Sequence, residues 1–180
     1  MFQDVNSIQN IAVLLNGRMR TPKIEALHRL IDWLNSRSNL KVEPIFKLGL
    51  DNSNLNTNPW LSGFIEADGK FYFCFKLNAE GIAAELKSYM RISQQRLYSN
   101  NSLILEKNNS NFFIMEKIKE FLNIKKVTEI KINKENFIEL SYEIRTTKKT
   151  SCEILTNYLS VYSLFSSKYQ DFYLGLNLIK

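Results

Sequence analysis

The most restrictive feature of this sequence is a change of period at Gly69, within the stretch PWLSGFIEADGKFYFCFK (59–76). Residues 60–67 have the spacing of a short helix, and from Gly69 onward apolar and polar side chains alternate. A period of two is typical of a strand with one buried face and one open face. The switch therefore predicts a helix that leads directly into a half-buried strand.

The alternation divides the side chains of this strand into two sets. The apolar set, expected to face a core, is Phe71, Phe73, Phe75 and Leu77. The set expected to point outward is Lys70, Tyr72, Cys74 and Lys76. A second strand is predicted over Tyr89–Tyr98 in a hairpin with the first, with outward side chains Arg91, Ser93 and Gln95.

The rest of the chain continues this mixed pattern. Further elements are expected as a helix over 112–122, strands over 126–132 and 137–146, and helices over 151–162 and from about 167 to the end. The order from residue 59 is therefore α-β-β-α-β-β-α-α. We predict an α+β fold in which four antiparallel strands form an open, polar saddle and the helices cover the other face.

The first 58 residues follow a different pattern. Apolar side chains recur at helical spacing from Ile24 to Leu34, whereas residues 36–58 lack a period and are rich in polar turn residues. We therefore predict an N-terminal helical extension with a linker (1–58), followed by one compact domain (59–180).

Composition narrows the classes of function. The 180 residues carry a formal net charge of +6, which favours a polyanionic partner. Cys74 and Cys152 lie far apart and His28 is the single histidine, so neither a zinc site nor a histidine-based catalytic triad is expected. No stretch has the form of a membrane span or a signal peptide, so a soluble protein without a membrane partner is expected.

Residues 61–69, LSGFIEADG, resemble the nonapeptide that gives the LAGLIDADG homing endonuclease family its name. Two other stretches agree, because ISQ (92–94) resembles the family's second-strand signature and LFSSKYQDF (164–172) resembles the basic segment that opens its last helix. Residues 16–35 resemble the end of the first half in members with two motifs. The resemblance covers essentially the whole chain and implies a second-motif half of an intron-type member whose first motif is missing.

The resemblance implies an active site between two motif helices that pack side by side. Small residues allow two helix backbones to approach closely, and the interface positions expected on the motif helix are Leu61, Ser62, Gly63, Ile65 and Ala67. Asp68 at the helix foot would meet its twin, and the paired carboxylates would hold Mg²⁺. Lys168 would stabilise developing negative charge, and Gln94 would order the solvent. Glu66 is expected to cap or orient rather than to catalyse.

The resemblance also implies that the polar face of the saddle enters a major groove. The nucleic-acid-binding residues expected there are Lys70, Tyr72, Lys76, Arg91, Ser93, Gln95 and Arg145. Outward side chains on the third and fourth strands are predicted to be Glu129, Lys131, Glu139, Ser141, Glu143 and Arg145. Three carboxylates on this face would repel phosphates, although an error of one residue in register would produce the same pattern.

Two hypotheses remain open, and both retain nucleic-acid binding. In the first, a homodimer with one Asp68 from each subunit cuts a near-palindromic DNA site with Mg²⁺. In the second, a non-catalytic RNA-binding protein serves as an intron maturase or as a structural component of a mitochondrial ribosome or other organellar ribonucleoprotein, and another protein or the N-terminal extension covers the motif helix. A purely protein-binding module has no positive signal beyond the apolar motif helix. The mitochondrial matrix is the expected location, from family habit and the asparagine-rich runs.

Overall fold

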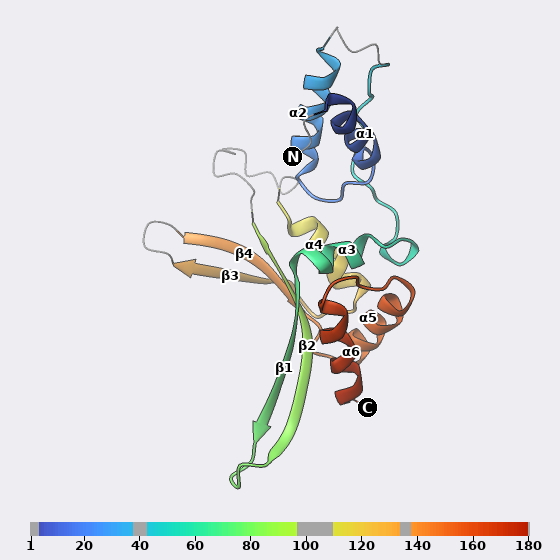
Figure 1. Ribbon diagram of the computed structural model, residues 1–180. Helices are drawn as coiled ribbons and strands as arrows, with labels where there is room; N and C mark the ends of the chain where they lie inside the picture. The colour runs from blue at the N-terminus through green and yellow to red at the C-terminus, as the bar shows by residue number, and fades with distance from the viewer. Residues whose placement is uncertain (1–3, 38–42, 97–109, 134–137, 180) are drawn as a thin grey trace. The chain divides into compact units, whose positions relative to one another are not determined.

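The computed structural model describes residues 4–37, 43–96, 110–133 and 138–179 (Figure 1). They form two compact units that divide after Ser53. We call residues 4–37, 43–53 and 110 the helical unit and the other described residues the sheet unit. The last two residues of the strand predicted over Tyr89–Tyr98 lie outside the described residues. No helix in the described part of the chain is long and apolar enough to cross a membrane.

The helical unit contains α1 (Val5–Leu15) and α2 (Ile24–Asn35), which pack on each other. Their shared core consists of Ala12, Leu27, Ile31 and Leu34. Residues 43–53 are tied to both helices, because the Asn16 side chain bonds the backbone of the segment at two points and Asn35 bonds it at two more. The segment predicted as an unpatterned linker is therefore fixed by side-chain amides.

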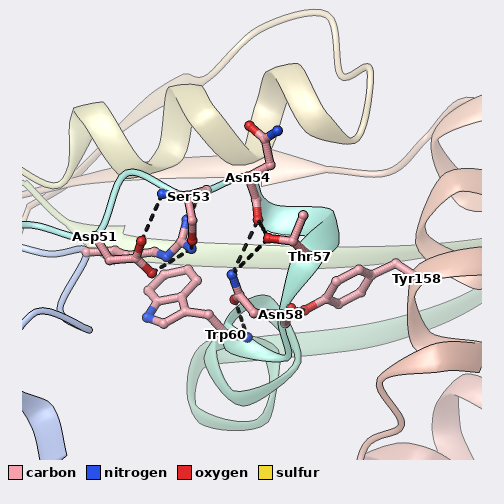
Figure 2. Close-up of polar contacts among 8 residues, drawn as sticks. Asp51, Ser53, Asn54, Thr57, Asn58, Trp60 and Tyr158 are labelled. Carbon is pink, nitrogen blue, oxygen red and sulfur yellow. Dashed lines mark hydrogen bonds and ion pairs between the residues drawn. The ribbon is translucent and has the colours of Figure 1, made fainter.

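A buried ion pair closes the end of this segment. Arg20 lies 2.7 Å from Asp51 and also donates to the backbone and hydroxyl oxygens of Ser53, each at 2.6 Å. Figure 2 shows the matching bond from the Ser53 N–H to the Asp51 carboxylate, at 2.8 Å. Burial acts to raise the pKa of Asp51, but the hydrogen bonds from Ser53 and the charge of Arg20 outweigh it and lower that pKa.

The sheet unit follows the predicted order of elements. After a short 3-10 helix, η1 (Leu55–Thr57), its elements are α3 (Trp60–Asp68), β1 (Gly69–Leu77), β2 (Ala83–Gln95), α4 (Phe112–Phe121), β3 (Thr128–Asn133), β4 (Ile138–Arg145), α5 (Lys149–Val161) and α6 (Lys168–Ile179). The strands form one antiparallel sheet in the order β1-β2-β4-β3. This is the α+β fold with a four-stranded open sheet that the sequence predicts.

The hairpin of β1 and β2 is longer than its partner strand β4. β1 pairs with β2 along its whole length, whereas β4 pairs only with Arg91–Gln95 of β2. The first part of β2, from Ala83 to Tyr89, therefore pairs with one neighbour only, and the hairpin projects as a two-stranded ribbon (Figure 1). β2 begins six residues before the predicted start, because residues 83–88 contain no aromatic or β-branched side chain that would indicate a strand.

The core lies between one face of the sheet and the four helices. The sheet contributes Met90, Ile92, Tyr142 and Ile144, and the helices contribute Leu61, Ile65, Ile114, Met115, Ile118, Leu155, Tyr158 and Leu159. We call this side of the sheet the helix face. The opposite side, which carries Lys70, Arg91 and Arg145 in one row across three strands, is called the groove face.

The predicted outward set on the third strand is wrong. Thr128 pairs with Glu143 and Ile130 pairs with Ser141, so the side chains of Thr128 and Ile130 lie on the groove face. Glu129 pairs with Tyr142, which places Glu129 and Lys131 on the opposite side. β3 is an edge strand, and Glu129, Lys131 and Ile132 are all exposed. The alternation of apolar and polar residues in this strand therefore did not indicate which face is buried. The predicted set on β4 is confirmed.

Candidate active site and nucleic-acid interface

The beginning of α3 is held by a residue 96 positions away in the sequence. The helix has no side-chain cap of its own at Pro59, but the Asn58 side chain accepts from the Trp60 N–H at 3.1 Å. The hydroxyl of Tyr158 in α5 accepts from the Ser62 N–H at 3.1 Å. It donates to the Asn58 carbonyl at 2.9 Å, and Figure 2 shows Tyr158 beside Asn58. These contacts satisfy N–H groups that a helix start leaves unpaired. Tyr158 thus acts as a tertiary cap for α3.

Replacing Tyr158 by phenylalanine should therefore lower the free energy of unfolding by about 1–3 kcal/mol, because it leaves a buried N–H without its acceptor. Urea unfolding of the full chain would measure the change. The matched control is Tyr162→Phe, since the Tyr162 hydroxyl has no hydrogen-bond partner among the described residues. Equal losses in the two variants would contradict a capping role for Tyr158.

The two sides of α3 differ in what they contact. Leu61 and Ile65 are fully buried in the core of the sheet unit, and Ser62 is buried with its hydroxyl donating to the Ser163 carbonyl at 3.1 Å. These three residues were predicted to face a second helix, and that prediction is wrong because this unit's own core takes them. Gly63 and Ala67, one turn apart, are the predicted interface residues that are exposed. A Cβ atom at Gly63 would meet nothing within 4 Å.

The end of α3 places a carboxylate directly before the sheet. Asp68 is the last residue of the helix and is exposed. Gly69 begins β1, and a Cβ atom there would lie 2.7 Å from the Ile65 carbonyl oxygen and from its side chain. Only glycine fits this close approach without a shift of the neighbouring turn. Because α3 joins β1 without a loop, the Asp68 carboxylate lies only two residues before Lys70, whose side chain is on the groove face.

Lys168 contacts the carboxyl end of α3. It is the first residue of α6, and its ammonium group donates to the carbonyl oxygens of Ile65 at 3.1 Å and Glu66 at 2.6 Å. A cation is favoured at the carboxyl end of a helix, where carbonyl groups are unpaired and the helix dipole is negative. The structure therefore brings Lys168 to the same helix end as Asp68, as the sequence predicted.

Glu66 makes the reciprocal contacts. Its carboxylate accepts from the Ser166 N–H at 2.9 Å, from the Ser166 hydroxyl at 2.5 Å and from the Phe165 N–H. The hydrogen bond from the Ser166 hydroxyl, the backbone bonds and the charge of Lys168 together lower the pKa of Glu66. Glu66 and Lys168 thus fasten α3 to the segment before α6. The predicted orienting role for Glu66 agrees with these contacts.

The lowered pKa makes this fastening sensitive to acid. A carboxyl group whose pKa is lower in the folded state stabilises the fold fully above its unfolded pKa, and the contribution is lost as pH falls through the folded pKa. Wild type should therefore be more stable than Glu66→Gln at neutral pH, and the difference should shrink below about pH 4.3, the ordinary pKa of glutamate. Urea unfolding of both proteins across this range would show it, with Glu120→Gln at an exposed position of α4 as the control. A difference that does not change with pH would contradict the ionic contribution.

Gln94 lies on the helix face of β2. It is buried and pairs with Tyr142, whereas Arg91, Ser93 and Gln95 point to the groove face, as their predicted parity requires. The register places Arg91 beside Lys70, close to the foot of α3. The solvent-ordering role of Gln94 stays a prediction.

The predicted basic residues do share the groove face. Lys70 of β1, Arg91 of β2 and Arg145 of β4 lie directly opposite one another in a row across the three strands. Tyr72 and Tyr89 form the next row, and their rings stack at a centroid distance of 5.1 Å. The remaining groove-face residues of the hairpin are Cys74, Lys76, Glu85, Lys87, Ser93 and Gln95.

The groove face is less acidic than its sequence indicates. Glu143 is only 5% exposed and pairs with Arg145 at 2.5 Å and with Arg91 at 3.6 Å. Glu139 accepts a long hydrogen bond from Gln95, at 3.4 Å. With Glu129 on the opposite side, the expected repulsion of phosphates by three free carboxylates does not arise.

Residues 61–178 match the family model described as LAGLIDADG endonuclease. The chain belongs to this family. It is 26% identical over 190 residues to "Intron-encoded DNA endonuclease aI3" of Saccharomyces cerevisiae, with 94% of this chain covered. It spans only 44% of the length of that relative.

Solved structures of the LAGLIDADG family are similar at lower identity. The homing endonuclease I-TnaI is 17% identical with a TM-score of 0.48, covering 68% of this chain and 71% of that chain. The LAGLIDADG meganuclease I-CpaMI bound to uncleaved DNA is 20% identical with a TM-score of 0.46, covering 67% of this chain and 35% of the other.

Asp68 is the residue of α3 that could serve as a ligand for a divalent cation. Among the described residues, no three His, Cys, Asp or Glu side chains are grouped to hold a metal ion. Asp68 presents one exposed oxygen ligand, while the carbonyl oxygens of Ile65 and Glu66 are taken by Lys168. Mg²⁺ is bound by carboxylate oxygens together with water and phosphate oxygens, so Asp68 fits as one ligand but needs others from outside this unit.

Two residues of the site were missed by the sequence analysis. Tyr158 falls among the buried positions of α5 but its role depends on a contact far away in the sequence. Tyr89 has the same parity as Arg91 and Ser93 and lies opposite Tyr72. Tyr89 was already inside the predicted second strand, so its parity with Arg91 is the signal that could have placed it on the groove face.

Proposed function

We propose that this protein binds duplex DNA through the groove face of the sheet unit and cleaves it where two LAGLIDADG helices meet. The observation that carries the proposal is the arrangement at the foot of α3. An exposed carboxylate at Asp68 shares its helix end with the Lys168 ammonium group, and the chain continues at once into the row of Lys70, Arg91 and Arg145. A cleaving group is thus joined to a surface that attracts phosphate.

The second helix supplies what a single unit lacks. Gly63 and Ala67 form an exposed line of small residues, so another helix backbone can approach α3 there. A second copy of the chain, related by a twofold axis, would place its Asp68 near the first. Such a homodimer would recognise a near-palindromic DNA site.

Within the paired site, Asp68 of each copy would hold Mg²⁺. The bound metal supplies an activated water nucleophile and charge stabilisation at the leaving oxygen. Lys168 keeps a positive charge at the helix end, where it offsets the negative charge that develops on the phosphate. The contacts of Glu66 and Tyr158 hold the helix in place, so both act as positioning residues.

Cleavage of a plasmid library with randomised inserts would test the proposal. The full chain should produce linear DNA from a subset of sequences with Mg²⁺, and it should bind but not cut when Mg²⁺ is replaced by Ca²⁺. Light scattering should give the mass of a dimer for the cutting species. A protein that stays monomeric, or that cuts no member of the library, would overturn the cleavage proposal.

The same assays address the RNA-binding alternative. That hypothesis relied in part on an acidic groove face, and the structure pairs Glu143 with two arginines and moves Glu129 to the other side. Selective binding of structured RNA in place of duplex DNA, with steep salt dependence, would favour a maturase or a ribonucleoprotein component.

Similarity to an intron-encoded endonuclease supports an intron-encoded origin and an organellar location for this chain as well.

A further inference from the structure

A compact cluster of two arginines, two tyrosines and one glutamate lies on the groove face. Arg91 and Arg145 are direct neighbours on β2 and β4, and Tyr72 and Tyr89 are stacked beside them. The guanidinium of Arg91 lies 4.5 Å from the centre of the Tyr72 ring, and that of Arg145 lies 5.6 Å from the centre of the Tyr89 ring. The guanidinium group of each arginine therefore lies over one ring of the tyrosine pair.

Glu143 connects the two guanidinium groups. One of its oxygens lies 2.5 Å from Nε of Arg145, and the other lies 3.6 Å from Nε of Arg91. The hydrogen bond that Arg145 donates to this carboxylate is the main reason why the pKa of Arg145 is raised. In both contacts the nitrogen closest to Glu143 is Nε. Arg91 also donates to the Tyr72 hydroxyl through its outer nitrogen Nη2, so a bidentate base contact by Arg91 would replace this bond.

This arrangement leaves positive charge without full compensation. Lys70, Arg91 and Arg145 stand directly opposite one another, and like charges in such positions destabilise a sheet. One carboxylate, Glu143, offsets only part of this charge. Within the described residues both Nη groups of Arg145 are without a hydrogen-bond partner, and its side chain is 45% exposed. A row of this kind is suited to a ligand that presents paired acceptors.

We propose that Arg91 and Arg145, oriented by Glu143 and the tyrosine pair, select guanine at two neighbouring base pairs of the DNA site. This inference rests on the proposed function, since it names the bases read by that groove face. Guanine presents O6 and N7 together in the major groove, and a planar guanidinium matches both acceptors at once. Neighbouring strands lie about 4.8 Å apart, a spacing that lets two adjacent side chains reach successive bases.

Phosphate oxygens offer the same paired acceptors, so the test must separate bases from backbone. The full chain would be incubated with a duplex library of random sequence, and bound DNA would be sequenced. The variants are Arg91→Lys, Arg145→Lys and Glu143→Gln, with Lys76→Ala as the comparison for a cation farther along the ribbon. Thermal unfolding of each variant would confirm that it folds.

The expected wild-type site contains two adjacent positions where guanine is preferred. Arg91→Lys and Arg145→Lys should each lower that preference about tenfold or more at one position. Glu143→Gln should lower it at both positions, because it removes the negative charge between the two guanidinium groups and replaces one of the two accepting oxygens by an amide nitrogen that cannot accept. Lys76→Ala should weaken binding without changing the preferred bases.

Three outcomes would overturn the inference. Enriched sites without guanine at neighbouring positions would exclude this reading of the cluster. A uniform loss of affinity in both lysine variants, with base preferences unchanged, would show that the two arginines contact backbone phosphates and not bases. An unchanged preference in folded Glu143→Gln would remove its positioning role. If wild type enriches no duplex DNA at all, the proposed function itself fails, and that result differs from the other three.

Discussion

DNA cleavage by the variant Asp68→Asn should fall by about 100-fold to 1,000-fold or more, the range seen when a group that stabilises transition-state charge is removed. Asp68 is the exposed carboxylate at the foot of α3, and asparagine keeps its shape while removing the charge that holds a divalent cation. DNA binding should be unchanged or slightly stronger, because a negative charge near the phosphates is lost.

Linearisation of the preferred plasmid with Mg²⁺ would measure cleavage, and a gel-shift assay with Ca²⁺ would measure binding. Asp171→Asn is the matched control, since Asp171 is an exposed carboxylate in the first turn of α6. Cleavage at the wild-type rate by Asp68→Asn would place the chemistry elsewhere. Loss of binding together with cleavage would indicate a structural role for Asp68.

The variant Gly63→Leu should have opposite effects on stability and on cleavage. A Cβ atom added at this exposed position meets no atom within 4 Å in the isolated unit, and leucine favours a helix more than glycine by up to about 1 kcal/mol. The free energy of unfolding should therefore stay the same or rise. Cleavage should be lost, because a leucine on the exposed line of Gly63 and Ala67 prevents close approach of a second helix.

Urea unfolding, light scattering and the plasmid assay would be applied to the same preparation. The expected result is a stable monomer that binds DNA and does not cut it. Asn157→Leu, at an exposed position of α5, controls for the addition of one apolar side chain to a helix. A dimer that still cuts would show that α3 pairs through another surface, or that pairing is not required.

The sequence predicted the sheet unit well where one face of a strand is covered. On the first half of β1 and the second half of β2, side chains such as Phe71 and Ile92 face the core and Lys70 and Arg91 face outward, as the alternation predicts. Phe75 and Leu77 were also predicted to face a core, and that prediction is wrong because both are exposed near the end of the hairpin. On β3 no layer of helices covers the strand to the same extent, and Ile132 remains exposed. The alternation of apolar and polar residues in β3 therefore did not identify its buried side, and its side chains were predicted on the wrong faces of the sheet.

The same physical reason decides which positions of the candidate site could be predicted. The position of Asp68 follows from the local join of a helix to a strand, which nine successive residues specify. The solvent-ordering role of Gln94 came from the resemblance alone and stays a prediction. The contacts of Tyr158 and Glu66 cross about 100 residues of sequence and depend on how α5 and α6 pack against α3. No local pattern could have predicted them.

The projecting ribbon has a mechanical consequence for recognition. From Ala83 to Tyr89, β2 is paired with β1 alone, and α6 contacts this part of the hairpin near Phe73 and Ser88. A two-stranded hairpin is only marginally stable by itself. Near its end Phe75 and Leu77 are 65% and 55% exposed, so little packing restrains it there. The far part of the ribbon should therefore bend to follow the helical path of a duplex, while the part beside α3 stays rigid. Amide hydrogen exchange that becomes faster toward the tip, and slows on DNA binding, would be the signature of such a compliant arm.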